Sequence, residues 1–216
     1  MFFDFSKRLL DIIGSGIGLI IFSPLFLITA ILIKADSQGP VFYTPTRVGK
    51  DGEPFRMYKF RSMIMKRAGK KFVHAEEILK SNPKLLEQYK RNSYKLVDDP
   101  RVTVIGKFLR KYSIDEFPQL LNILKGEMSL VGPRAYMPDE LAEQQKIYPM
   151  TIQYVATLLS IKPGATGPWQ VGGRSKINFD HRVRMDAAYA LRRSFAYDLG
   201  ILLKTVPTVL KGEGAT

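Results

Sequence analysis

The most prominent feature of the hydropathy pattern is one long apolar segment near the N-terminus. Residues 9–33 carry a single charged side chain, that of Asp11, and are long enough to cross the hydrocarbon core of a membrane as a helix. Pro24 interrupts the segment, because proline lacks the backbone donor of a helix and clashes with the carbonyl four residues earlier. Ser23 can bond the carbonyls that the break frees, so we expect a sharp bend at Ser23 and Pro24 between two halves too short to span alone.

Basic residues flank the apolar segment on both sides. Lys7 and Arg8 precede it, and Lys34 follows it. Since cytoplasmic flanks carry an excess of Lys and Arg, both ends are expected on the cytoplasmic side, which favours a re-entrant helix–break–helix in one leaflet. A kinked transmembrane span stays open as an alternative. A cleaved signal peptide is a third interpretation, although the segment is overlong for one and is broken by proline.

Short β-forming and helical patterns follow the apolar segment. Residues 37–61 mix glycine and proline with β-forming side chains around the turn signal Asp51-Gly52, which is typical of a short β-hairpin. Apolar side chains recur at helical spacing from Phe117 to Gly126, and glycine suits the end of a helix. We expect two loops rich in glycine and proline at 132–138 and 162–174. Two helical stretches are expected after them, around 183–194 and 197–210.

A polar stretch, residues 63–98, lies between these patterns. A proline divides it into two expected helices, around 75–80 and 84–94. They are either a mobile flap over a site or a solvated helical pair. The fold class that follows is α+β and predominantly helical, with a re-entrant membrane anchor at 1–36 and a globular cytoplasmic domain at 37–216 that carries the helical insertion.

Composition narrows the chemistry that the chain can perform. The 216 residues include 33 Lys and Arg against 20 Asp and Glu, which gives a net charge of +13 and favours anionic partners such as phosphates, nucleic acid or acidic lipid. The absence of cysteine excludes disulfides, zinc–thiolate sites, iron–sulfur clusters and thiol catalysis. The two histidines, His74 and His181, exclude a multi-histidine metal centre. A metal would therefore be a hard one held by carboxylates.

Two adjacent carboxylates, Asp115 and Glu116, stand where a helix is expected to begin. Ser113 with Glu116 three residues later forms a capping-box pattern, while a proline at position 118 suits a slightly later start. The positive end of the helix and the cations Arg110 and Lys111 are expected to favour the ionised form, which a carboxylate nucleophile or a Mg²⁺ ligand requires. Ordinary capping carboxylates are the structural alternative.

Basic residues cluster beside turn glycines or in short pairs. Arginine forks match phosphate oxygens, and glycine lets backbone amides approach them closely. A solvated basic surface, or a surface that docks to anionic lipid, explains the same clusters. The candidate phosphate-binding residues are Lys59, Arg61, Arg110, Arg134 and Arg174.

Together, several segments resemble the bacterial sugar transferase family, the monotopic polyprenyl-phosphate phosphoglycosyl transferases. They cover most of the chain outside 63–98. The C-terminal tail and the 63–98 stretch resemble the branch that starts O-antigen or exopolysaccharide units with hexose-1-phosphate more than the smallest members. The extra N-terminal transmembrane helices frequent in that branch are absent from this sequence, so the catalytic portion is expected. Ala135 replaces the proline usual after GPR, which could alter the loop that aims Arg134, and Ala165 replaces a larger aliphatic residue in KPGxTG. The matching stretches are Lys7-Arg8 with the Ser23-Pro24 break, GPVFYTPTRVGKDGEPFRMYKFRSM, DPRVTVIGKFLRKYSIDEFPQLLNILKGEMSLVGPR, KPGATGPWQVGGR and DLGILLKTVPTVLKGEGA.

The resemblance implies roles for these residues. Asp115 would attack the sugar-linked phosphorus of a UDP-sugar, expel UMP and form an aspartyl phosphosugar, which polyprenyl (undecaprenyl) phosphate would accept. Glu116 would assist as a base or as a partner of the metal. A Mg²⁺ ion at Asp115 and the five basic residues would neutralise developing charge. The implied location is the bacterial inner membrane, with the catalytic domain on the cytoplasmic face, at the first membrane step of O-antigen, capsule or exopolysaccharide assembly.

Other interpretations stay open on the sequence. One is a non-catalytic, membrane-docked protein that binds anionic lipid through its basic surface, and a direct displacement is the rival mechanism for an enzyme. Nucleic acid is not expected as a partner, because the basic residues lie beside turn glycines and an anchor precedes them. The transferred sugar, the prenyl length and homo-oligomer formation are undetermined, with galactose favoured by the branch resemblance.

Overall fold

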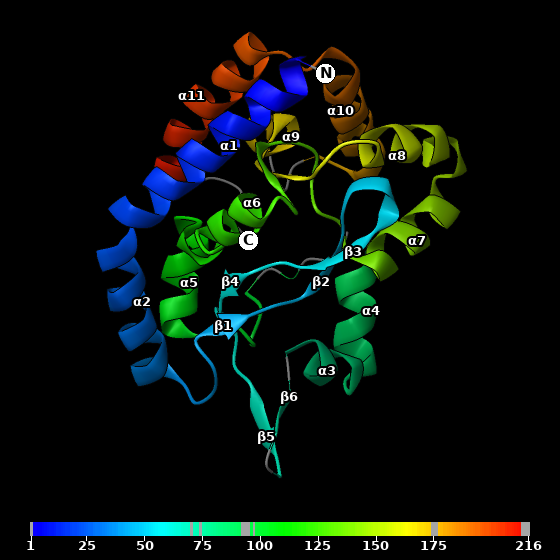
Figure 1. Cartoon of the computed structure of the whole chain (residues 1–216). Coiled ribbons are helices and arrows are strands. Elements are labelled where there is room, and N and C mark those ends of the chain that lie inside the picture. The colour runs from blue at the N-terminus through cyan, green and yellow to red at the C-terminus, as the bar shows by residue number, and fades with distance from the viewer. Residues whose placement is uncertain are drawn as a thin grey trace.

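The computed structural model describes residues 2–69, 71–73, 75–91, 96, 98–173 and 177–212, and helices predominate in it (Figure 1). The helices are α1 (Phe2–Ile21), α2 (Ser23–Asp36), α3 (Ala75–Lys80), α4 (Pro83–Arg91), α5 (Val104–Lys111), α6 (Gln119–Lys125), α7 (Pro138–Ile147), α8 (Ile152–Leu159), α9 (Pro168–Gly172), α10 (Phe179–Arg192) and α11 (Phe195–Lys211), with single 3-10 turns η1 (Lys50–Gly52), η2 (Ile114–Glu116) and η3 (Pro149–Thr151). The strands are β1 (Phe42–Tyr43), β2 (Thr46–Val48), β3 (Pro54–Arg56), β4 (Lys59–Phe60), β5 (Lys66–Ala68), β6 (Lys71–Val73), β7 (Ser129–Val131) and β8 (Gly164–Thr166).

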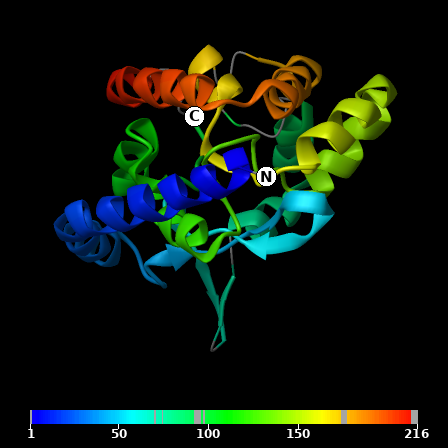
Figure 2. The same ribbon diagram turned by 45° about the horizontal axis from the view of Figure 1, so that its top comes forward.

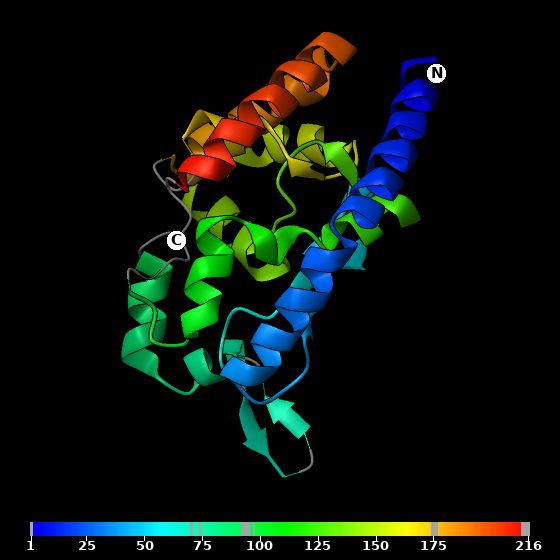
Figure 3. The same cartoon turned by 90° about the vertical axis from the view of Figure 1, so that its left-hand side faces the viewer.

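Helices α1 and α2 form a bent rod along one flank of the molecule (Figures 1 and 3). Their axes meet at 59°. Pro24 lies in the first turn of α2, where its missing donor costs nothing, and Ser23 Oγ donates to the carbonyl of Ile20 at 2.8 Å. The predicted break at Ser23 and Pro24 is therefore confirmed, but the two helices are longer than the apolar segment because α1 begins at Phe2 and α2 continues to Asp36.

None of the described helices is both long and apolar enough to cross a bilayer alone, whereas α1 and α2 together meet that measure as a bent pair. Many apolar side chains of the pair are exposed; those at least half exposed are Phe5, Leu10, Ile17, Ile20, Ile21, Leu27, Ile28 and Ile31. Re-entry into one leaflet and a kinked span both agree with this geometry, so both stay predictions.

The N-terminal half of α1 is held against the rest of the chain by polar contacts. Asp11 is buried, and its Oδ1 accepts from the hydroxyl of Ser129 at 3.0 Å and the backbone N–H of Leu130 at 2.9 Å. Arg8 donates to the carbonyl of Ile123 at 2.5 Å, in the last turn of α6. Asp11, the one charged residue of the apolar segment, is therefore bonded to β7 and buried inside the molecule.

The predicted β-hairpin is confirmed, and it carries a second pair of strands. Strands β2 and β3 are antiparallel around a turn in which Asp51 and Gly52 both have positive φ, at 56° and 83°. Strand β1 pairs with β4, so that Phe42 lies opposite Phe60. The second pair continues the hairpin toward α2, and its strand β4, which begins with Lys59, lies near the centre of the molecule (Figure 1).

The stretch 63–98 contains the two predicted helices as α3 and α4, together with a hairpin that the sequence analysis did not predict. Strands β5 and β6 pair antiparallel and project away from the body of the molecule (Figures 1 and 2). The hairpin shows no alternation of apolar and polar residues, since basic residues occupy four of the eight positions 66–73. The predicted continuation of the second helix to 94 lies outside the described residues.

The two loops rich in glycine and proline lie side by side, joined by the short parallel pair of β7 and β8. Gly132 N–H donates to the carbonyl of Thr166 at 2.9 Å, and Gly164 N–H donates to that of Pro133 at 2.8 Å. The prediction of 162–174 as a loop was wrong in part, because that range includes β8 and α9. Strands of three residues give too short an alternation to be recognised in the sequence.

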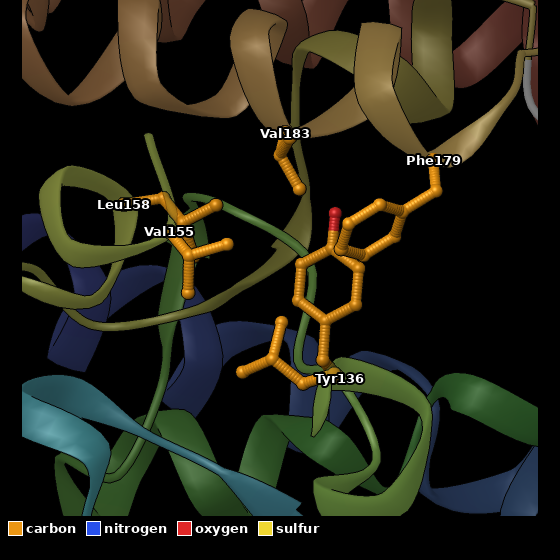
Figure 4. Close-up of a cluster of buried hydrophobic side chains, with 6 residues drawn as sticks. Tyr136, Val155, Leu158, Phe179 and Val183 are labelled. Carbon is orange, nitrogen blue, oxygen red and sulfur yellow. The ribbon is translucent and has the colours of Figure 1, made fainter. Parts of the chain in front are cut away.

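The largest apolar cluster lies between α7, α8 and α10, under the loop that follows β7 (Figure 4). Helix α10 begins earlier than predicted, because Asn178 caps it by accepting from the N–H of His181 at 3.0 Å. In α11, Ile201 belongs to the core, whereas Leu203, Val206 and Leu210 are exposed. The cluster consists of Tyr136, Leu141, Val155, Leu158, Phe179 and Val183.

Candidate active site

One cavity gathers most of the predicted site residues. It has a volume of about 300 Å³ and lies where the paired hairpin strands, α5 with η2, and the loops around β7 and β8 meet. Arg174 lies outside the described residues. The predicted residues that line the cavity are Lys59, Arg61, Arg110, Asp115, Glu116 and Arg134.

The backbone between α5 and α6 sets the position of Asp115 and Glu116. Helix α5 ends at Lys111, Ser113 adopts a left-handed conformation with φ of 54°, and the two carboxylates follow in the single turn η2. The predicted capping box was wrong, because the Ser113 side chain caps no N–H and α6 starts only after Pro118. The left-handed residue reverses the chain and turns Asp115 into the cavity.

Asp115 is buried and lies next to one ammonium group. Only 7% of its surface is exposed, and its Oδ2 is 3.9 Å from Lys59 Nζ. Lys59 also donates to Glu116 Oε1 at 2.6 Å. The two carboxylates therefore differ, because Glu116 forms the close ion pair and Asp115 keeps an oxygen available toward the cavity.

Burial dominates the titration of Asp115. It raises the pKa of the Asp115 carboxyl to about 6, and the charge of Glu116 adds to the increase, while Lys59 and Arg110 oppose it. The sequence analysis expected nearby cations and the helix end to keep this pKa low. The cations do lower it, but burial raises it by more, so the expected net direction was wrong. With a pKa near 6, the carboxylate is still mainly ionised at pH 7, and its partial desolvation makes it a stronger nucleophile than a hydrated one.

Arg110 is the cation of the site whose guanidinium is available to a ligand. Among the described residues its guanidinium makes no hydrogen bond or ion pair, and it lines the cavity beside Asp115. Its charge lowers the pKa of Asp99 as well as that of Asp115. A phosphate entering the cavity would find this guanidinium without displacing a protein partner.

Arg134 extends from the loop after β7 and is held by two contacts. Its backbone N–H donates to Asp186 Oδ2 at 3.0 Å, and its guanidinium carbon lies 5.0 Å from the centre of the Trp169 ring. Arg182 lies 4.8 Å from the same ring. The contact with the Trp169 ring restrains the Arg134 guanidinium at the wall of the cavity, and a guanidinium fork matches phosphate oxygens.

Arg61 uses its guanidinium to bond other parts of the protein. Although it lines the cavity, it is 3% exposed, and its guanidinium donates to main-chain and side-chain oxygens at the end of α2. Its role as a phosphate ligand stays a prediction. These acceptors are the carbonyls of Ile33, Ser37, Gln38 and Pro40 and the hydroxyl of Ser37.

Sequence reasoning missed two further arginines in the cavity wall, Arg47 and Arg101. Arg101 forms a buried ion pair with Asp99 at 2.6 Å. Arg47 sits on β2 opposite Phe55. Neither belongs to a basic pair or stands next to a turn glycine, and these were the two signals used. The proline that precedes Arg101 in DPR and the position of Arg47 in the predicted hairpin could have indicated them.

The carboxylates of the cavity are suited to a hard divalent ion only in part. No group of three or more acidic or histidine side chains that could hold a metal occurs among the described residues. Mg²⁺ usually takes one or two protein carboxylates and completes its octahedron with water and substrate phosphates. Asp115 and Glu116 fit that mode, with phosphate oxygens as the remaining ligands.

Comparisons with known proteins agree with this arrangement. The bacterial sugar transferase family matches residues 2–212. The exopolysaccharide production protein ExoY of Rhizobium meliloti is 41% identical over 97% of this chain and 88% of its own length. The undecaprenyl-phosphate galactose phosphotransferase of Salmonella typhimurium is 42% identical over 98% of this chain but 42% of its own length.

A further relative differs in the sugar that its name specifies. The UDP-glucose:undecaprenyl-phosphate glucose-1-phosphate transferase of Caulobacter vibrioides is 35% identical over 98% of this chain and 72% of its own length. The match extends over nearly the whole chain and includes the cavity, the hairpin strands and the N-terminal helices. The chain therefore belongs to the bacterial sugar transferase family.

Proposed function

We propose that this protein transfers a sugar-1-phosphate from a UDP-sugar to polyprenyl phosphate, releases UMP and forms a polyprenyl-diphosphate-sugar. This would be the first membrane step in assembling an O-antigen, capsule or exopolysaccharide. The observation that carries the proposal is the cavity in which the buried Asp115 lies next to Lys59 and feels the charge of Arg110, and whose lining also includes Arg134. A carboxylate in a cavity lined by cations is suited to attack an anionic phosphorus centre.

In the first step, an oxygen of Asp115 attacks the phosphorus that bears the sugar. The bond from that phosphorus to the bridging oxygen breaks, and UMP leaves with the electron pair. Lys59 compensates the negative charge of Glu116 and Asp115, while Arg110 and Arg134 offer guanidinium donors to the phosphate oxygens. The product is an aspartyl phosphosugar at Asp115.

In the second step, an oxygen of the lipid phosphate attacks the same phosphorus. The bond to the Asp115 oxygen breaks, which regenerates the carboxylate and releases the lipid-linked diphosphate sugar. Glu116 is adjacent and 41% exposed at its side chain, so it can accept a proton from an incoming phosphate or help to hold a cation. Bound Mg²⁺ would neutralise phosphate charge, with Asp115 and Glu116 as its protein ligands.

The position of the site relative to α1 and α2 agrees with two substrates from different phases. A UDP-sugar is soluble, whereas the phosphate of a polyprenyl lipid lies at the membrane surface. The exposed apolar side chains of α1 and α2, with those of α5 and α11, supply a surface that could dock at this boundary. In α5 and α11 they are Val104, Phe108, Leu199, Leu203, Val206 and Leu210.

A UMP-release assay tests the proposal. Wild-type protein in nanodiscs that contain undecaprenyl phosphate should release UMP from at least one member of a UDP-sugar panel with Mg²⁺ present. Asp115→Asn should abolish release, whereas Asp139→Asn, an exposed carboxylate outside the cavity, should not. Absence of release with every donor, together with retained binding to anionic vesicles, would favour the non-catalytic, lipid-binding alternative.

The covalent step has a separate test, because a direct displacement gives the same products. Incubation with a UDP-sugar and Mg²⁺ but no lipid phosphate should add the mass of one hexosyl phosphate to the peptide that contains Asp115. An active enzyme that never yields this adduct would instead use direct displacement. Galactose and glucose donors are the first to try, since the names of two relatives specify those sugars.

A further inference from the structure

The C-terminal end of α2 is fastened to the strand that carries Lys59. Arg61 follows that strand, is 3% exposed and donates five hydrogen bonds to the last turn of α2 and the segment after it, at 2.7 to 3.4 Å. The carbonyls at the end of a helix have no partner within the helix, so a guanidinium that bonds several of them at once determines where the helix ends. Arg61 therefore fixes the end of α2 relative to β4.

Three successive residues connect α2 to the carboxylate pair: Lys59 contacts the carboxylates, and Phe60 and Arg61 contact α2. Lys59 bonds Glu116 at 2.6 Å and lies 3.9 Å from Asp115. Phe60 is buried and packs edge-on against Phe26 of α2, with ring centres 5.3 Å apart. With Arg61 bonded to the α2 terminus, any displacement of α2 has to displace Lys59 as well.

A second connection runs from α2 to the other cation beside Asp115. Asp36, the last residue of α2, accepts from the backbone N–H of Ile105 at 3.2 Å in the first turn of α5. Helix α5 carries Arg110 in its last turn and leads directly into η2 with Asp115. The side chains of Ile33 and Leu109 pack in the same buried cluster, so α2 and α5 contact each other along their length.

We propose that Arg61 and Asp36 are positioning residues that make the placement of Lys59 and Arg110 around Asp115 depend on how α2 is seated in the membrane. The inference rests on the proposed function and adds a condition to it. Neither residue needs to touch substrate, and Asp36 does not line the cavity. A chain whose α2 is withdrawn from lipid would retain its nucleophile but lose the arrangement of the two cations.

The first test compares Arg61→Gln with Arg56→Gln in nanodiscs. Arg56 belongs to the same hairpin, but its side chain is exposed and donates only to the carbonyl of Thr44 among the described residues. It does not line the cavity. We expect Arg61→Gln to lower kcat for UMP release by roughly ten- to a hundredfold, as small misplacements of catalytic groups do. We expect its KM for the UDP-sugar to stay within about twofold, and Arg56→Gln to behave as wild type.

The ratio of the two constants separates positioning from phosphate binding. A raised KM with an unchanged kcat would make Arg61 a phosphate ligand and overturn its proposed role. Asp36→Ala removes the acceptor of the Ile105 N–H and gives an independent test, which serves if Arg61→Gln does not fold, because an acidic residue outside the cavity cannot bind phosphate. It should also lower kcat with little change in KM, while Asp139→Ala, at an exposed carboxylate outside the cavity, should not. Wild-type kcat in Asp36→Ala would contradict the connection through α5.

Hydrogen exchange distinguishes failure of this inference from failure of the proposed function. In Arg61→Gln, amides at 33–40 and 104–110 should exchange faster than in wild type, whether or not the chain releases UMP. Faster exchange in a protein that turns over no UDP-sugar would support the mechanical connection and reject only the function. Unchanged exchange at both segments would overturn the inference.

Discussion

At the scale of single residues, Lys59 has the most direct influence on the candidate nucleophile. It bonds Glu116, lies 3.9 Å from Asp115 and lowers the pKa of Asp115 against the effect of burial. Lys59→Met should lower kcat/KM for UMP release by about two orders of magnitude, as removal of one charge-stabilising donor does in other enzymes. The acid limb of its pH–rate profile should move to higher pH, because the Asp115 carboxyl then ionises less readily.

The control for this variant is Lys50→Met, which changes a half-exposed lysine of the hairpin turn. It should keep the wild-type pH profile. Equal activity of Lys59→Met and Lys50→Met would contradict the role of Lys59 beside the carboxylate pair.

Asp186 gives a prediction about stability and pH. Complete burial raises the pKa of its carboxyl to about 7, although the Arg134 N–H, Arg182 and Arg134 oppose the increase. The pKa of an unfolded aspartate is about 3.9, so the folded protein binds more protons than the unfolded chain between those pH values. The contribution of Asp186 to the free energy of unfolding should therefore fall as pH rises through this window, by at most about 1.4 kcal/mol per pH unit.

Denaturation of wild type and Asp186→Asn at pH 5 and pH 7.5 checks this sign. The wild type should lose more stability than Asp186→Asn on going to the higher pH. Asp180→Asn, on the same helix but paired with Arg184 at the surface, should follow the wild type. Parallel pH dependence of wild type and Asp186→Asn would contradict the prediction.

The residue scale also shows what the sequence could and could not predict. Six charged residues of the cavity followed from motifs that combine a charge with turn residues or with a second charge, whereas Arg47 and Arg101 did not. Their partners did not follow, since Arg61 bonds groups that precede it by 21 to 28 positions. The pKa of Asp115 depends on burial, which no local pattern of charges contains.

At the scale of elements, the close approach of β7 and β8 depends on Gly132. A Cβ at this position would lie 2.6 Å from the carbonyl oxygen of Lys162 and 2.7 Å from the nitrogen of Gly164. Gly132→Ala should therefore separate the strands, at a cost of about 1–3 kcal/mol in the free energy of unfolding, and displace the loop that carries Arg134. A lower thermal midpoint and slower UMP release are the expected measurements.

Gly200→Ala in α11 is the matched control, because a Cβ there meets no atom within 4 Å. That exchange should leave activity unchanged and stabilise the protein by up to about 1 kcal/mol, since alanine is the better helix former. If Gly132→Ala were as stable and active as Gly200→Ala, the contact of the two strands would not position Arg134.

Elements with local determinants were predictable, and those built from distant contacts were not. The helix at 75–80, the hairpin turn at Asp51 and the break at Pro24 each follow from a few neighbouring residues. The parallel pair of β7 and β8 joins Ser129 to Gly164 far along the chain, so neither strand has a signal of its own. Of the two predicted starts of this helix, the capping box at Ser113 was wrong, because Ser113 adopts a left-handed conformation that is uncommon for serine, and the later start near Pro118 is confirmed.

At the scale of the whole molecule, charge and apolar surface act together. The net charge of +13 attracts an anionic leaflet, and the exposed apolar residues of α1 and α2 supply the area that would insert. Polar contacts hold both helices of this pair to the rest of the chain. Asp11 of α1 bonds β7, and Arg61 bonds the end of α2. The bent pair and the candidate active site therefore form one connected body, so a membrane that takes up the pair would set the height of the cavity above the lipid phosphates.

Sidedness is the property of the whole molecule that separates a re-entrant anchor from a kinked span. The chain contains no cysteine, so single cysteines can report accessibility without background. Ser6→Cys and Gln38→Cys lie on either side of the apolar segment 9–33, and Asp139→Cys marks the exposed surface of the domain. Because basic residues flank both ends of the apolar segment, all three cysteines should react with a membrane-impermeant maleimide only when the cytoplasmic face is open. Labelling of Ser6→Cys from the opposite face, with Gln38→Cys and Asp139→Cys still cytoplasmic, would mean that the pair crosses the bilayer and that the bend at Pro24 is a kink within one span.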